Sequence, residues 1–104
     1  MKKKLIQVFI PLYDNQGILF PKKFFNTLQS ELSDRYGGLT VYQQMPATGL
    51  WKEEGEPVMK DDLVIYEVMA DEVDTTYWST FKTIWKDKFR QEELLIRSMD
   101  IDLL

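Results

Sequence analysis

The pattern of hydrophobic and polar positions predicts four strands and two helices. In residues 4–12, apolar side chains occupy both faces of an extended chain, and Gln7 is a polar interruption. A strand that is apolar on both faces is typical of the middle of a covered sheet. We expect strands over residues 4–12, 39–45, 62–69 and 94–104, and helices from Pro21 to Gly37 and from about Thr75 to Phe89.

The two predicted helices carry recognisable ends and buried stripes. Gly37 follows the first helix and can supply a left-handed C-cap, while Asp74 precedes the second and can accept a free backbone N–H. Apolar residues recur on one side of each helix. The stripes are Phe24, Phe25, Leu28 and Leu32 in the first helix and Trp78, Phe81, Trp85 and Phe89 in the second. An aromatic stripe at this spacing is more typical of core than of a ligand pocket.

The order β-α-β-β-α-β predicts one α+β domain over residues 1–104 with a ferredoxin-like fold. This fold has a four-stranded antiparallel sheet with both helices on one face. The first and third predicted strands would be central, and these are the two that are apolar on both faces.

The second face of such a sheet is too apolar here to be left in water. Depending on the register, it carries Phe9 or its neighbours and either Ile65 or Tyr66. We therefore expect a homodimer in which two sheets meet face to face, as in dimeric α+β barrels. The alternative is a monomer with a few exposed apolar side chains.

The chain has no His and no Cys, which excludes disulfides, thiolate nucleophiles, imidazole metal sites and Ser-His catalysis. Acid–base chemistry would then depend on Asp, Glu, Tyr or Lys. Glu67 and Arg97 each interrupt an apolar strand face. They either bind a polar ligand, or form a structural salt bridge or simply extend their charged ends into solvent, and these structural arrangements are commoner than a ligand site.

The net charge of −4 argues against a nucleic-acid partner, including the RNA-recognition type of ferredoxin-like domain. Residues 52–74 hold nine acidic and two basic residues, so this stretch carries −7 and the remainder +3. Its acidic groups lack the spacing of a calcium loop, and we expect no metal and no cofactor. We interpret Lys2, Lys3 and Lys4 as a solvated flank of the first strand, and we expect no membrane partner and a cytoplasmic location.

A long connection from Ala47 to Asp61 contains Gly, Pro and charged residues around Trp51. An aromatic residue has no obvious structural reason to be there. Trp51 is therefore a candidate ligand contact, and the alternative is a side chain that covers the sheet edge.

Four segments together are similar to a family of small uncharacterised bacterial proteins catalogued as a domain of unknown function. They are LIQVFIPL at 5–12, YGGLTVY at 36–42, Gly49-Leu50-Trp51, and KFRQEELLIR at 88–97. The resemblance implies a compact α+β domain with Trp51 and Gln91 at matching positions. The chain departs from the family at Ile10-Pro11-Leu12, where the family has a Phe-Gly step, and the resemblance supplies no catalytic residues.

Two functions remain open from the sequence. The first is a non-enzymatic homodimeric module that binds a small ligand or a protein partner. The second is a cofactor-independent enzyme of the dimeric α+β barrel type, similar to small monooxygenases or isomerases, with a pocket between helices and sheet. We name no catalytic residue. The candidate ligand contacts are Tyr42, Trp51, Tyr66, Glu67, Gln91 and Arg97.

Overall fold

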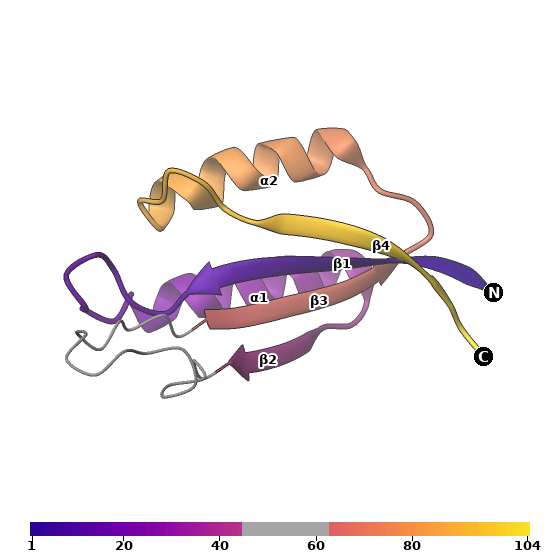
Figure 1. Ribbon diagram of the computed structural model, residues 1–104, viewed down its shortest axis with the longest axis horizontal. Helices are drawn as coiled ribbons and strands as arrows, with labels where there is room; N and C mark the ends of the chain where they lie inside the picture. The colour runs from indigo at the N-terminus through magenta and orange to yellow at the C-terminus, as the bar shows by residue number, and fades with distance from the viewer. Residues whose placement is uncertain (45–62) are drawn as a thin grey trace, which may run out of the picture.

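The computed structural model describes residues 1–44 and 63–104 of the chain. Its elements are β1 (Lys2–Pro11), α1 (Lys22–Tyr36), β2 (Thr40–Gln44), β3 (Leu63–Ala70), α2 (Thr75–Lys88) and β4 (Ile96–Asp102) (Figure 1). The strands form one antiparallel sheet in the order β2-β3-β1-β4. The predicted α+β class with a four-stranded antiparallel sheet is confirmed, and the strand order is consistent with a ferredoxin-like fold.

Local signals set the ends of both helices. The backbone of Gly37 is left-handed, with φ 72°, and its N–H donates to the Ser33 carbonyl over 2.8 Å. A residue with a side chain is strained in this conformation, so glycine ends α1 at low cost. The carboxylate of Asp74 accepts the Tyr77 N–H over 3.0 Å and caps α2, as predicted.

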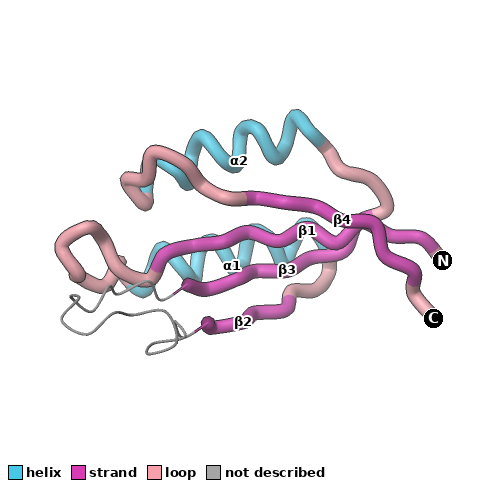
Figure 2. The backbone as a smooth tube through the Cα atoms, viewed as in Figure 1, coloured by secondary structure: helices cyan, strands magenta, loops and turns pink. Residues whose placement is uncertain are grey.

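Both helices pack on one face of the sheet, where the alternate residues of the two central strands are buried. Val8 lies opposite Tyr66 in the β1–β3 register, and both side chains are at most 1% exposed. Leu28 and Leu32 of α1 and the aromatic stripe of α2 complete the same core. In Figure 2 the helix α1 runs behind β1 and β3, and α2 runs alongside β4.

Aromatic rings fill the space between α2 and the sheet. Trp78, Phe81, Trp85 and Phe89 are all at least 94% buried. Ring centroids of successive members lie 4.9–6.1 Å apart, within the range of favourable ring contacts. The predicted role of this stripe as core is confirmed.

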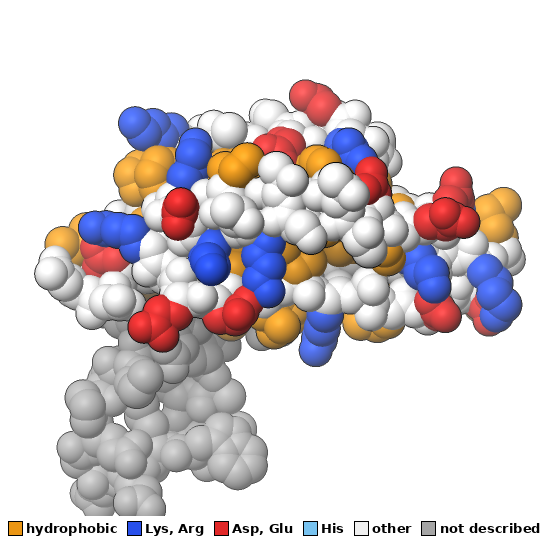
Figure 3. Space-filling view, turned by 90° about the horizontal axis from the view of Figure 1, so that it is seen from above, with side chains coloured by type: hydrophobic (Ala, Val, Ile, Leu, Met, Phe, Trp, Pro, Cys, Tyr) orange, Lys and Arg blue, Asp and Glu red, His pale blue; other side chains and the backbone are white. Residues whose placement is uncertain are grey.

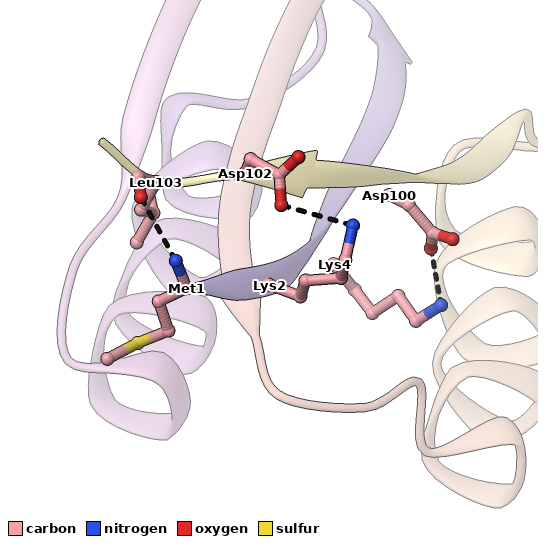
Figure 4. A network of polar contacts seen from close by, with 6 residues as sticks. All are labelled: Met1, Lys2, Lys4, Asp100, Asp102 and Leu103. Atoms are coloured by element: carbon pink, nitrogen blue, oxygen red, sulfur yellow. Dashed lines mark hydrogen bonds and ion pairs between the residues drawn. The ribbon is translucent and has the colours of Figure 1, made fainter.

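The first strand begins at Lys2, two residues before the predicted start, because charges on β4 match those on β1. Lys2 lies opposite Asp102 and Lys4 opposite Asp100, and both pairs form salt bridges (Figure 4). The Met1 ammonium also donates to the Leu103 carbonyl over 3.1 Å. Acidic and basic side chains accordingly lie close together at the end of the molecule where the termini meet (Figure 3).

Removing the Lys4 ammonium by Lys4→Met is expected to raise the pKa of Asp100. That pKa lies below its ordinary value because Lys4 donates a hydrogen bond to the carboxylate and attracts its charge, with a smaller attraction from Lys2. Because the pKa of Asp100 is lowered in the folded state, the Lys4–Asp100 pair stabilises the fold at pH values above the unfolded-state pKa of Asp100. This stabilisation is lost as the pH falls through the folded-state pKa. NMR titration of the carboxyl carbon measures the change.

The matched control for Lys4→Met is Lys2→Met, because Lys2 pairs with Asp102 and contributes least to the lowered Asp100 pKa. We expect this control to raise the Asp100 pKa less than Lys4→Met does. An equal rise in both variants would contradict the direct Lys4–Asp100 contact.

Candidate functional site

The side of the sheet opposite the helices, here called the open face, carries three rows of side chains that run across the strands. The β1–β3, β1–β4 and β2–β3 registers place the members of each row side by side. The polar row is Thr40, Glu67, Gln7 and Arg97; the first apolar row is Met69, Leu5 and Met99; the second apolar row is Tyr42, Ile65 and Phe9.

Gln7 connects the charged groups of the polar row. Its side-chain nitrogen donates to Oε2 of Glu67 over 2.8 Å, and its oxygen accepts from Nε of Arg97 over 2.8 Å. Gln7 therefore holds an acid on one side and a base on the other. Among the described residues Glu67 and Arg97 form no direct ion pair with each other, so the predicted salt bridge is replaced by a shared amide.

An aromatic ring also positions the Arg97 guanidinium. The guanidinium carbon lies 4.9 Å from the centroid of the Phe9 ring, a distance typical of a cation–π contact. Together with the hydrogen bond to Gln7, this contact holds the exposed Arg97 side chain across the open face.

Much of the apolar surface of the open face is accessible. Met69 is 49% exposed, Tyr42 47% and Met99 38%, while Leu5 and Phe9 are half-buried. Ile65 differs, since only 6% of it is exposed. Apolar side chains thus lie on both sides of the polar row.

Three of the six predicted contact residues, Tyr42, Glu67 and Arg97, come together on the open face. Tyr66 lies on the opposite face, where burial raises the pKa of its hydroxyl and Gln29 donates to it over 3.3 Å. Gln91 follows α2 and donates to the Phe89 carbonyl. Trp51 lies outside the described residues.

Two hollows adjoin the sheet. The larger, of about 330 Å³, is lined by residues 36–40, which run from the end of α1 to the start of β2, and by Leu5, Glu67 and Met69, so it opens at the edge of the open face. The second, of about 230 Å³, lies between α2 and residues 96–98 of β4. Sites for small molecules usually measure about 300–1,000 Å³, so only the larger hollow reaches this range.

The carboxyl groups whose pKa values are shifted have structural roles. Asp14, Glu93 and Asp100 have lowered pKa values, caused first by a hydrogen bond from the Ile18 backbone, from Lys82 and from Lys4, respectively. A lowered pKa favours the carboxylate, whereas a general acid at neutral pH needs a raised one. Among residues 1–44 and 63–104, no group of three or more acidic side chains is placed to hold a metal ion.

The sequence reading missed two members of the open face that matter most to its layout, Gln7 and Leu5. Gln7 was visible only as an interruption of an apolar run, and Leu5 as one apolar residue among several. The signal that identifies them is the register, which places both in the central strand between charged or apolar neighbours on each side.

Searches against protein-family models, curated proteins and solved structures give no match for this chain. The resemblance to a family of bacterial proteins therefore stays a prediction. In the part of the chain that the structure describes, no helix is both long and apolar enough to cross a membrane.

Proposed function

We propose that the protein is a small cytoplasmic interaction module that self-associates as a homodimer through its open face. The observation that carries this proposal is the pair of apolar rows on either side of the polar row. Covering an apolar side chain of this size gains about 1.5–3 kcal/mol relative to full exposure. Contiguous apolar surface rimmed by polar groups is typical of an interaction site.

An enzyme with a pocket between helices and sheet has less support. Trp78, Phe81, Trp85 and Phe89 fill most of that space together with the strands' buried residues, and the hollow of about 230 Å³ beside α2 is smaller than a usual small-molecule site. The larger hollow, beside Glu67 and Met69, is where a small ligand of the module would fit. Such a ligand would lie at the edge of the proposed dimer interface.

The size of the open face sets the affinity that we expect. Four strands about 4.8 Å apart and about seven residues long give a planar patch of roughly 19 by 23 Å. Stable complexes usually bury about 800 Å² on each partner, so this interface is at the low end of the size range of specific protein–protein interfaces. We therefore expect a dimer that dissociates in the micromolar range.

Sedimentation equilibrium of the native protein from about 1 to 200 μM tests the proposal across that range. The expected result is a mass that rises with concentration from the 12.4 kDa monomer to twice that value. A constant 12.4 kDa species throughout would overturn the proposed homodimer.

A further inference from the structure

The charge along the polar row of the open face changes sign about Gln7. Glu67 on β3 and Arg97 on β4 each lie one strand away from Gln7 on β1, at about 4.8 Å spacing between strands. From β3 to β4 the row therefore carries an acidic, a neutral amide and a basic side chain. On one side of it the first apolar row is also centred on β1, at Leu5, and on the other side the second apolar row reaches β1 at Phe9.

We infer that two copies of the chain pack face to face about a two-fold axis that runs parallel to the strands and passes over Gln7. This inference rests on the proposed function, and it specifies the arrangement of the dimer. Rotation about such an axis exchanges the two sides of β1 but keeps each row at its own height along the strands. Glu67 of one copy then faces Arg97 of the other, and the reverse pair forms at the other side of the axis.

The same rotation places the first apolar row over its own counterpart and Phe9 of the second apolar row over Phe9 of the second copy. Leu5 meets Leu5 of the second copy on the axis, and Met69 faces the second copy's Met99. The middle of the open face, around Gln7, is thus complementary to itself in charge and in hydrophobicity at once. Two-fold interfaces require this property, because one patch must serve both partners.

The alternative axis in the interface plane runs perpendicular to the strands. Passing over Gln7 as well, it would run along the polar row and place Glu67 opposite Glu67 and Arg97 opposite Arg97 in the middle of the interface. Like charges that face each other across an interface are strongly unfavourable, and an unpaired charge removed from water is costly as well. The charge order of the polar row therefore selects the axis parallel to the strands.

A charge-exchange experiment tests this arrangement. Glu67→Arg alone places two arginines opposite each other at both ends of the row, and Arg97→Glu alone does the same with two glutamates. We expect each variant to self-associate at least about tenfold more weakly than the native protein, because a close interfacial charge pair couples by more than a factor of ten. An equimolar mixture restores both pairs, so the two variants should form a heterodimer of near-native affinity.

Matched variants control for net charge. Asp34→Arg and Lys23→Glu change the charge by the same amounts on exposed positions of α1, and they should leave self-association and mixing unchanged. Glu67→Arg shifts the net charge from −4 to −2 and Arg97→Glu shifts it to −6. Both variants stay negative, so an overall attraction between them cannot produce the heterodimer.

The outcomes separate the two proposals. If the native protein is a monomer at every concentration, the proposed homodimer itself fails. If the native protein is a dimer but the mixed variants do not associate, or if either variant alone dimerises as well as the native chain, the dimer stands and the arrangement about Gln7 is wrong. Circular dichroism of each variant verifies that its fold is retained.

Discussion

Phe89→Ala is expected to lower the free energy of unfolding by about 3–5 kcal/mol. The Phe89 side chain is fully buried at the end of α2. The centroid of its ring lies 4.9 Å from that of Phe20 and 5.6 Å from those of Phe24 and Phe25, so it joins α2 to α1 and to the segment before α1. Truncation removes these contacts and leaves a cavity. Because domains of this size have about 5–15 kcal/mol of stability, the loss is a large part of the total.

Urea unfolding at one fixed protein concentration measures the Phe89→Ala effect, since any self-association would also add stability. Phe89→Leu should cost less, because it retains most of the volume. Ile84→Ala, at a side chain of α2 that is 49% exposed, should cost less than about 1 kcal/mol. A Phe89→Ala loss as small as that of Ile84→Ala would contradict the role of Phe89 as the junction of the core.

The fold could be predicted because each element has its own local signal. Gly37 ends α1 and Asp74 begins α2 by interactions within a few residues, and the stripe of α2 repeats at helical spacing. Which residues of β3 point toward the helices could not be predicted in the same way. It is apolar on both sides, and a register shift of one residue exchanges the two faces. Only the pairing with β1 places Tyr66 in the core and Ile65 on the open face.

The candidate site could be predicted in part for the same reason. Glu67 and Arg97 were identified because each interrupts an apolar pattern, which is a local property of one strand. That Gln7 lies between them is a property of two strand pairings far apart in the chain. The sequence likewise predicts a solvated flank for the lysines of β1, but it does not show that Lys4 pairs with Asp100, 96 residues away. Polar contacts between distant strands leave no mark in the periodicity of either strand.

Met69→Lys is expected to raise the dissociation constant of the proposed homodimer at least about tenfold. Met69 belongs to the first apolar row on a central strand and is 49% exposed in the single chain, so a lysine there is tolerated by the monomer. In the dimer the ammonium would be brought against apolar side chains. Because Met69 is already half-buried in the single chain, about half of the 1.5–3 kcal/mol for full burial is lost at each site, and two-fold symmetry doubles this loss to about 1.5–3 kcal/mol, or tenfold and more.

Ile84→Lys is the matched control for Met69→Lys, because Ile84 is also 49% exposed but lies on α2, away from the open face. Both variants replace an equally accessible apolar side chain with the same charge, so a general effect of charge or solubility would be the same in both. Sedimentation at a concentration where the native chain is dimeric should show a 12.4 kDa monomer for Met69→Lys and a dimer for Ile84→Lys. The opposite pattern would move the interface from the sheet to α2. If both variants remain dimeric, neither surface is buried in the dimer, since a buried lysine without a partner is too costly for an interface of this size.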